Sequence, residues 1–257
     1  MSLLRQVLKL LALGLLLTGC VTNHEPRERA LEAVAAYSEP VFSARRVLSE
    51  DVVDPLVIAD PWHGTNRFMY GFNAGLDRVA LNPLVRGYRR VVPTPLRQGV
   101  TNFFDNLDMI RTTANLALQG RPADTGRAAT RLLTNTTLGL AGFFDVASRM
   151  NQRTYDEDFG QTLGRYGVGQ GPYVVLPLFG PSNLRDAIGR AVDAAFLGFL
   201  DPLELNGNAA RGVIYYPFLI VDTRATTAFQ YFQSGSPFEY ELVRKLFATK
   251  RSLDVGK

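Results

Sequence analysis

Apolar residues recur at helical spacing along most of this chain and predict helices over much of it. Between residues 95 and 118 they fall every three or four positions, and Thr94 is placed to cap the long helix that this spacing predicts. Gln119-Gly120 is expected to end that helix, and a second helix is expected from Pro122. Further helices are predicted over residues 183–199, 209–233 and 238–247.

Two of the predicted helices have a distinct apolar face. Asp60 can cap a helix that begins at Pro61, and Phe68 and Phe72 would share one face of it with Leu76. Taken alone, this pattern is typical of an amphipathic helix that packs on a core. The helix predicted over residues 183–199, with Ser182 as its cap, has an apolar face of the same kind, formed by Leu184, Ile188, Val192, Ala195 and Phe199.

The longest uncharged stretch runs from Tyr166 to Leu184, between two arginines. Its length would suit a membrane-spanning helix, but its four glycines and three prolines exclude one. Only Tyr173 to Leu176 is free enough of these residues to form a short strand. Two interpretations stay open. The stretch is either irregular backbone sheltered by protein at membrane depth or a buried loop between core helices of a soluble protein, and composition alone favours the loop.

Composition excludes several classes of protein. The 257 residues carry 28 Lys and Arg against 24 Asp and Glu, and no stretch gathers cations with aromatics as nucleic-acid binding requires. A single Cys excludes a disulfide framework and a cysteine-rich zinc site. His24 and His63 lie too far apart in the sequence to suggest a metal cluster, and we expect neither a metal nor another cofactor.

The enzyme motifs that we considered are absent or incomplete. Asp158-Phe159-Gly160 imitates the magnesium motif of kinases, but the other kinase segments are missing. The sequence GVGQG does not match the dinucleotide-binding pattern, and no G-x-S-x-G elbow is present. We therefore expect no enzymatic activity.

The first residues have the pattern of a bacterial export signal. Arg5 and Lys9 precede a short leucine-rich run, and Leu17-Thr18-Gly19-Cys20 resembles the lipobox of bacterial lipoproteins. This resemblance implies that residues 1–19 are removed and that Cys20 carries the lipid anchor. Val21, in place of an aspartate, favours the outer membrane with the protein on its periplasmic face. Residues 20–54 then read as a tether with one spacer helix.

Four blocks in order carry a further resemblance. The segments DPWHGTNRFMYGFN, VPTPLRQGVTNFFDNL, LLTNTTLGLAGFFDVA and DFGQTLGRYGVGQGPYVVLPLFGPSNLRD together resemble the MlaA (VacJ) family of outer-membrane lipoproteins. The resemblance extends from about Asp60 to Asp201 and weakens beyond. His63 and Thr65 depart from it, at positions where an acidic and an aromatic residue are expected.

The resemblance implies an all-α protein, a ring of helices seated in one membrane leaflet around an amphipathic channel. We assign the ring to residues 55–250 and a flexible tail to residues 251–257, within a loose segment that begins at Thr249. The implied function is removal of misplaced phospholipids from the outer leaflet and their transfer to a soluble periplasmic carrier, beside an outer-membrane porin trimer. The alternative is a structural lipoprotein that braces porins without transport.

The predicted phospholipid path combines polar and apolar residues. Near the first block it contains Asn66, Arg67, Phe72 and Asn73, which would offer polar groups beside aromatic wall. Leu138-Gly139 lies in an uncharged segment of small and hydroxyl residues. Tyr215 and Tyr216 complete the path as a belt at headgroup level, although core aromatics explain this pair equally well.

Overall fold

The computed structural model describes residues 58–205, 209–233 and 236–256. Cys20, the predicted signal peptide and the predicted tether lie outside these residues. The described part is mostly helical, as the resemblance implies. Its helices are α4 (His63–Leu76), α5 (Asn82–Val91), α6 (Thr94–Leu118), α7 (Pro122–Thr137), α8 (Val146–Arg149), α9 (Phe159–Arg165), α10 (Leu184–Leu200), α11 (Ala209–Thr226) and α12 (Glu239–Val255).

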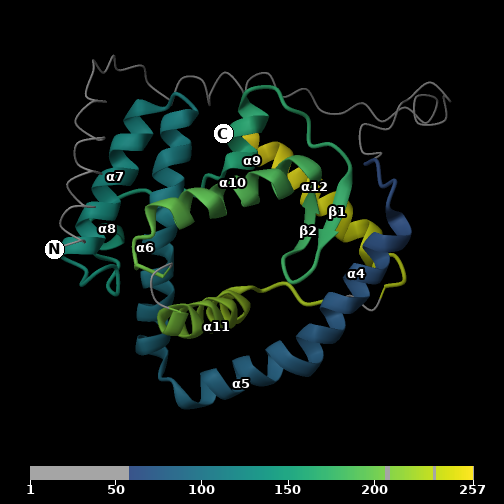
Figure 1. Ribbon diagram of the computed structural model, residues 1–257, viewed down its shortest axis with the longest axis horizontal. Helices are drawn as coiled ribbons and strands as arrows, with labels where there is room; N and C mark the ends of the chain where they lie inside the picture. Colours follow the sequence, from purple (N-terminus) through teal and green to yellow (C-terminus); the bar gives the residue numbers. More distant parts are fainter. Residues whose placement is uncertain (1–57, 206–208, 234–235, 257) are drawn as a thin grey trace, which may run out of the picture.

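The helices follow a curved path rather than a bundle (Figure 1). α4, a π-helical segment (Asp77–Leu81) and α5 run end to end as one arc, and α6 rises from the end of α5. α7 packs along α6, α9 packs on α10, and α11 lies inside the arc, where it contacts α5 and α6. Proline at the start of α5, α6 and α7 suits the first helical turn, where a backbone donor is not needed.

The uncharged stretch forms a hairpin beside α4 and α12. Strands β1 (Tyr173–Leu176) and β2 (Gly180–Asn183) pair antiparallel, with Tyr173 opposite Asn183. The strand predicted over Tyr173 to Leu176 is confirmed, and the described structure contains no helix across this stretch up to Leu184. Gly180 has a positive φ of 73°, which glycine adopts without strain and which lets the chain turn back into β2.

Two asparagines on α4 hold the open edge of β1. Asn66 donates to the carbonyl of Tyr173 (3.0 Å) and accepts from the amide of Val175 (2.9 Å). Seven residues later, on the same helix face, Asn73 bonds the carbonyl of Leu176 and the amide of Leu178, both at 2.9 Å. The two side-chain amides thus take the place of a third strand and satisfy backbone groups that would otherwise be left without partners.

The apolar faces of α4 and α10 point outward. Phe68 and Phe72 are exposed, whereas Asn66, Tyr70 and Asn73 are buried. On α10 the exposed side chains include Leu184, Ile188, Val192 and Phe199, and the buried ones are Arg185, Asp186, Gly189 and Asp193. The prediction that α4 packs its apolar face on a core is therefore wrong, because Phe68 and Phe72 point outward. The inward face carries Asn66 and Asn73 beside Tyr70, which joins a small apolar cluster with residues of β1 and α12.

Several predicted helix ends also need correction. Asp60 does not cap α4, because its carboxylate accepts instead from Asn66 (2.7 Å), Tyr240 (2.6 Å) and Arg244 (2.9 Å). Thr94 is the first residue of α6 rather than its cap, and the cap position is taken by Pro93. α10 is capped by Asn183 rather than by Ser182. α11 ends at Thr226, before the predicted end at residue 233, and α12 continues past the predicted end at residue 247 to Val255.

Candidate functional site

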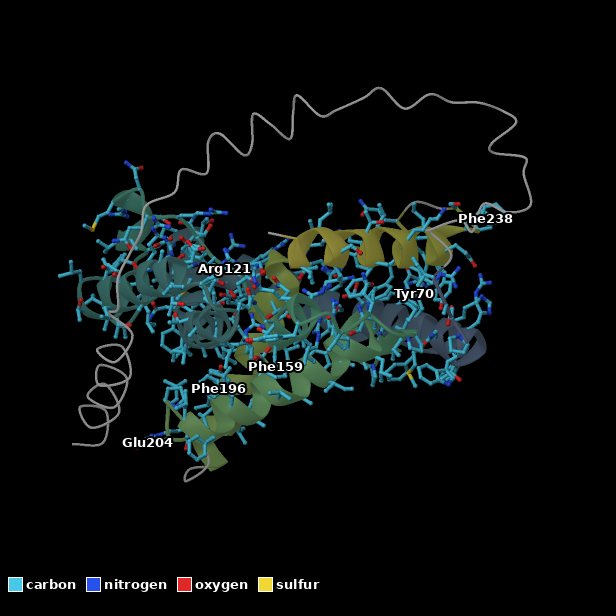
Figure 2. The ribbon with its side chains drawn as sticks, turned by 90° about the horizontal axis from the view of Figure 1, so that it is seen from above. Tyr70, Arg121, Phe159, Phe196, Glu204 and Phe238 are labelled. Carbon is cyan, nitrogen blue, oxygen red and sulfur yellow. The ribbon has the colours of Figure 1, made fainter. Side chains whose placement is uncertain are left out.

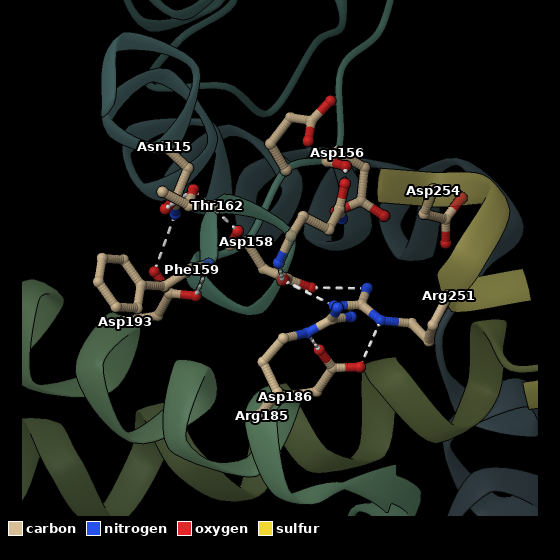
Figure 3. Close-up of polar contacts among 12 residues, drawn as sticks. Asn115, Asp156, Asp158, Phe159, Thr162, Arg185, Asp186, Asp193, Arg251 and Asp254 are labelled. Atoms are coloured by element: carbon tan, nitrogen blue, oxygen red, sulfur yellow. Dashed lines mark hydrogen bonds and ion pairs between the residues drawn. The ribbon is translucent and has the colours of Figure 1, made fainter. Parts of the chain in front are cut away.

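A network of charged side chains occupies the interior between α9, α10 and α12 (Figure 3). Arg251 on α12 forms two parallel hydrogen bonds to the carboxylate of Asp158, at 2.8 and 2.9 Å. Its Nε donates at 2.6 Å to Asp186, which also accepts from Arg185 at 3.0 Å. Because Asp158 caps α9 and Asp186 lies in the first turn of α10, one guanidinium joins three helices. Residues 249–255 are therefore not a loose tail.

The network continues toward α6 through uncharged polar groups. Asp193 accepts from Asn115 at 2.9 Å, and Asn115 accepts in turn from the hydroxyl of Thr162 at 2.8 Å. Gln119 then donates to Glu157 at 3.1 Å, and Glu157 pairs with the guanidinium of Arg121 at 2.7 Å. Among the described residues, buried polar side chains outnumber buried apolar ones, which is the reverse of a water-soluble domain.

Two opposing effects act on the pKa of Asp158. Burial alone would raise this pKa, but the hydrogen bonds and positive charge of Arg251 outweigh burial and hold it below its usual value. Burial also raises the pKa of Asp193, and the hydrogen bonds from Phe159 and Asn115 offset only part of that rise. The network therefore keeps Asp158 ionised mainly through one partner, Arg251.

The first four residues of the predicted path fall into two groups. The amides of Asn66 and Asn73 bind hairpin backbone, as described above, which gives both residues a structural role. Arg67 lies at the surface, 3.6 Å from Glu241 and over the ring of Tyr240, and Phe72 is exposed on the outer face of α4. Their part in a lipid path stays a prediction.

Leu138 and Gly139, the next two residues of the predicted path, differ sharply in their surroundings. Leu138 is exposed at the end of α7. A Cβ on Gly139 would lie 2.2 Å from the carbonyl oxygen of Phe144 and 2.4 Å from that of Asn135, and backbone cannot move aside cheaply.

We expect Gly139→Leu to lower the free energy of unfolding by about 1–3 kcal/mol or more, because overpacking against backbone forces the turn apart. Leu138→Gln is the matched control and should change stability by less than about 0.5 kcal/mol, since surface substitutions rarely do more. Urea unfolding of both variants provides the measurement. Equal stability of the two variants would contradict the prediction.

Tyr215 and Tyr216, the last two predicted residues, lie on α11. Their rings meet edge to face at 5.2 Å, and Tyr215 also packs against Phe104 of α6 at 5.6 Å. Tyr216 is exposed. The structure therefore places Tyr215 between helices and Tyr216 at the surface, and it does not join this pair to Asn66, Arg67 or Leu138 in one site.

A cavity of about 540 Å³ lies between α5, the start of α6 and the end of α11. Sequence reasoning missed it. Its lining includes Tyr88, Arg89, Arg97, Thr101 and Asp222. The available signal was the group of arginines on α5, which we could assign only to an interface or to a solvated face. Asp222 comes from a helix more than a hundred residues away, so no local pattern joins it to them.

The outer surface carries many large apolar side chains. On α11 the exposed residues include Val213, Ile214, Tyr216 and Phe218, and Phe199 on α10 is 86% exposed. Figure 2 shows the end of α10, marked by Phe196, at the edge of the molecule away from α12. None of the helices in the described ranges combines the length and the apolar character that crossing a bilayer requires.

The chain is similar to known proteins along most of its described length. The family model described as MlaA lipoprotein matches residues 58–254. Relatives from Shigella flexneri and Escherichia coli (strain K12), both named intermembrane phospholipid transport system lipoprotein MlaA, are 45% and 44% identical to this chain over 142 residues. These matches cover 54% of this chain and 57% of each relative, so the chain aligns with little more than half of their length.

Two longer matches extend the comparison. A relative of the same name from Haemophilus influenzae is 31% identical over 196 residues, which are 75% of this chain and 68% of the relative. A solved structure, described as the structural basis for maintenance of bacterial outer membrane lipid asymmetry, is similar with a TM-score of 0.62 and 33% identity. That match covers 77% of this chain and 99% of the solved chain. By the extent of the family match, this chain belongs to the MlaA lipoprotein family.

Proposed function

We propose that this protein is an outer-membrane lipoprotein that removes misplaced phospholipids from the outer leaflet and passes them to a soluble periplasmic carrier. In this proposal the helices form a ring seated in the inner leaflet, and Cys20 anchors it there. The headgroup passes through an amphipathic channel along polar side chains, and the acyl tails contact the apolar side chains of the channel wall. The lipid moves without covalent chemistry, so no catalytic residue is needed.

The observation that carries the proposal is the inverted distribution of polar and apolar side chains. Charged groups such as Asp186, Asp193 and Arg251 lie inside, and the apolar faces of α4 and α10 lie outside. Such a surface is stable when lipid tails cover it, and helices too short or too polar to span a bilayer suit a position within one leaflet. The names of the relatives, which refer to phospholipid transport, support the same function.

A structural lipoprotein that braces porin trimers is the second candidate. Exposed apolar helices could pack on a porin as well as on lipid, so the outer surface alone does not separate the two functions. The names of the relatives favour transport, because they refer to a phospholipid transport system.

Lipid transfer separates the two candidates directly. We expect cells that lack the gene to accumulate outer-leaflet phospholipid, and the wild-type chain to restore the normal level. Purified protein in vesicles should pass labelled phospholipid to the soluble carrier, with vesicles that lack the protein as the control. The structural brace would be favoured if the wild-type chain restored the outer-leaflet phospholipid level in cells but passed no phospholipid to the carrier in vitro. The carrier must be shown to bind phospholipid under the same conditions.

A further inference from the structure

The cavity between α5, α6 and α11 is lined by two arginines, Arg89 on α5 and Arg97 on α6. Arg97 uses its Nη2 on Thr94 at 2.9 Å, and Arg89 donates to the carbonyl of Ala225 at 2.5 Å. Both guanidiniums thus bond only to uncharged acceptors in these contacts, and their positive charge favours an incoming anion.

The same cavity contains a buried carboxylate. Asp222 is 4% exposed and accepts one hydrogen bond, from Thr101 at 2.9 Å. In the described part of the chain, no Lys, Arg or His lies within ion-pair distance of it. Burial raises the pKa of Asp222, and the hydrogen bond from Thr101 offsets part of that rise. A buried carboxylate in this situation favours an incoming cation.

Both signs of charge therefore face one cavity without neutralising each other. Neither Arg89 nor Arg97 forms an ion pair with any described carboxylate, Asp222 included. An inorganic phosphate would satisfy the donors but would meet repulsion from Asp222. A ligand that carries a phosphate and an ammonium group two carbons apart would satisfy both sides, because each group would have an oppositely charged partner.

We propose that this cavity binds the phosphoethanolamine headgroup of a zwitterionic phospholipid, with the phosphate on Arg89 and Arg97 and the ammonium on Asp222. The inference rests on the proposed lipid transport and names the headgroup that the protein prefers. The cavity volume of about 540 Å³ lies in the range of small-ligand sites. An anionic phosphatidylglycerol supplies the phosphate but leaves Asp222 without a cation.

The test is binding of two soluble short-chain lipids, dihexanoyl phosphatidylethanolamine and dihexanoyl phosphatidylglycerol, to the full chain in detergent, measured by calorimetry below the lipids' critical micelle concentrations. Wild-type protein should bind phosphatidylethanolamine roughly tenfold more tightly, the usual effect of one charge-assisted contact. Asp222→Asn should abolish that preference by weakening phosphatidylethanolamine alone. Arg97→Gln should weaken both lipids roughly tenfold, and Arg90→Gln, on the exposed side of α5, should change neither.

Three results would overturn the proposal. The first is equal binding of the two lipids by wild type, and the second is an unchanged preference in Asp222→Asn. The third is free phosphoethanolamine binding as tightly as the lipid, which would assign the cavity to a soluble ligand. Arg89→Gln removes the second guanidinium and should weaken both lipids severalfold, so the test survives even if Asp222→Asn fails to fold. If the protein prefers phosphatidylethanolamine but transfers no phospholipid to the carrier, only the transport proposal is refuted. If it transfers phospholipid but shows no headgroup preference, only the proposed headgroup site is refuted.

Discussion

Replacing Arg251 with methionine is expected to lower the free energy of unfolding by about 3–5 kcal/mol, because it leaves the buried carboxylate of Asp186 and the partly buried carboxylate of Asp158 without their shared cation. Arg251 is 7% exposed and contacts both Asp158 and Asp186. Methionine is shorter and apolar, so it restores neither the charge nor the hydrogen bonds. For a domain of this size the loss corresponds to about 10 °C in the unfolding temperature, which thermal unfolding in detergent would measure.

Two controls separate this ion-pair effect from a general effect of changing α12. Lys245→Met removes a cation from an exposed position of the same helix and should change stability by less than about 0.5 kcal/mol. Arg251→Lys retains the charge but loses the paired hydrogen bonds to Asp158, so its stability should fall between wild type and Arg251→Met. If Arg251→Met unfolds at the same temperature as Lys245→Met, the network does not hold the helices together.

The pH dependence of stability gives an independent readout of the same contact. Arg251 holds the pKa of Asp158 below its usual value, so Asp158 stabilises the native state at neutral pH. That contribution is lost as the pH falls through the lowered pKa. Without Arg251, burial alone would raise the pKa of Asp158. The variant should therefore lose less stability on acidification than wild type does.

Elements could be predicted from the sequence where they depend on the spacing of apolar residues and on nearby glycines and prolines. The long helix ending near Leu118, the helix from Pro122 and the strand from Tyr173 to Leu176 were all recoverable, because each depends on residues that are close together in the chain. The continuation of α12 to Val255 was missed. That helix is held by Arg251, whose partner Asp158 is 93 residues away, and no local pattern contains that contact.

Periodicity also could not tell which face of a helix is inside. Phe68 and Phe72 share a face of α4 as predicted, but an amphipathic pattern is the same whether its apolar face meets a protein core or lipid. A clue lay on the opposite face. On α4, Asn66 and Asn73 lie two turns apart on one face, and on α10 Arg185 and Asp193 lie at nearly the same spacing. A face that is only solvated does not require polar residues at such regular positions. The hydrogen-bond partners of these side chains became known only from the structure.

Introducing two glutamates on the outer face of α10 is expected to weaken binding to phospholipid vesicles by roughly 100-fold or more. Ile188 and Phe199 are exposed and lie three turns apart on one face. Burial of each such side chain in an apolar phase contributes about 1.5–3 kcal/mol, so the two together supply about 3–6 kcal/mol. Every 1.4 kcal/mol is about a tenfold change in partition.

The measurement is flotation of Ile188→Glu/Phe199→Glu with vesicles, in a Cys20→Ser background so that the predicted acyl anchor does not mask the effect. Thr130→Glu/Thr249→Glu is the matched control, because it adds the same charge at exposed positions of α7 and α12. Charge repulsion alone would weaken both pairs equally, whereas a lipid-covered α10 predicts loss for the α10 pair only. Thermal stability should be unchanged in both, since none of the four side chains is buried. Equal flotation of the two double variants would mean that α10 does not face lipid. Its apolar surface would then be expected to contact a protein partner.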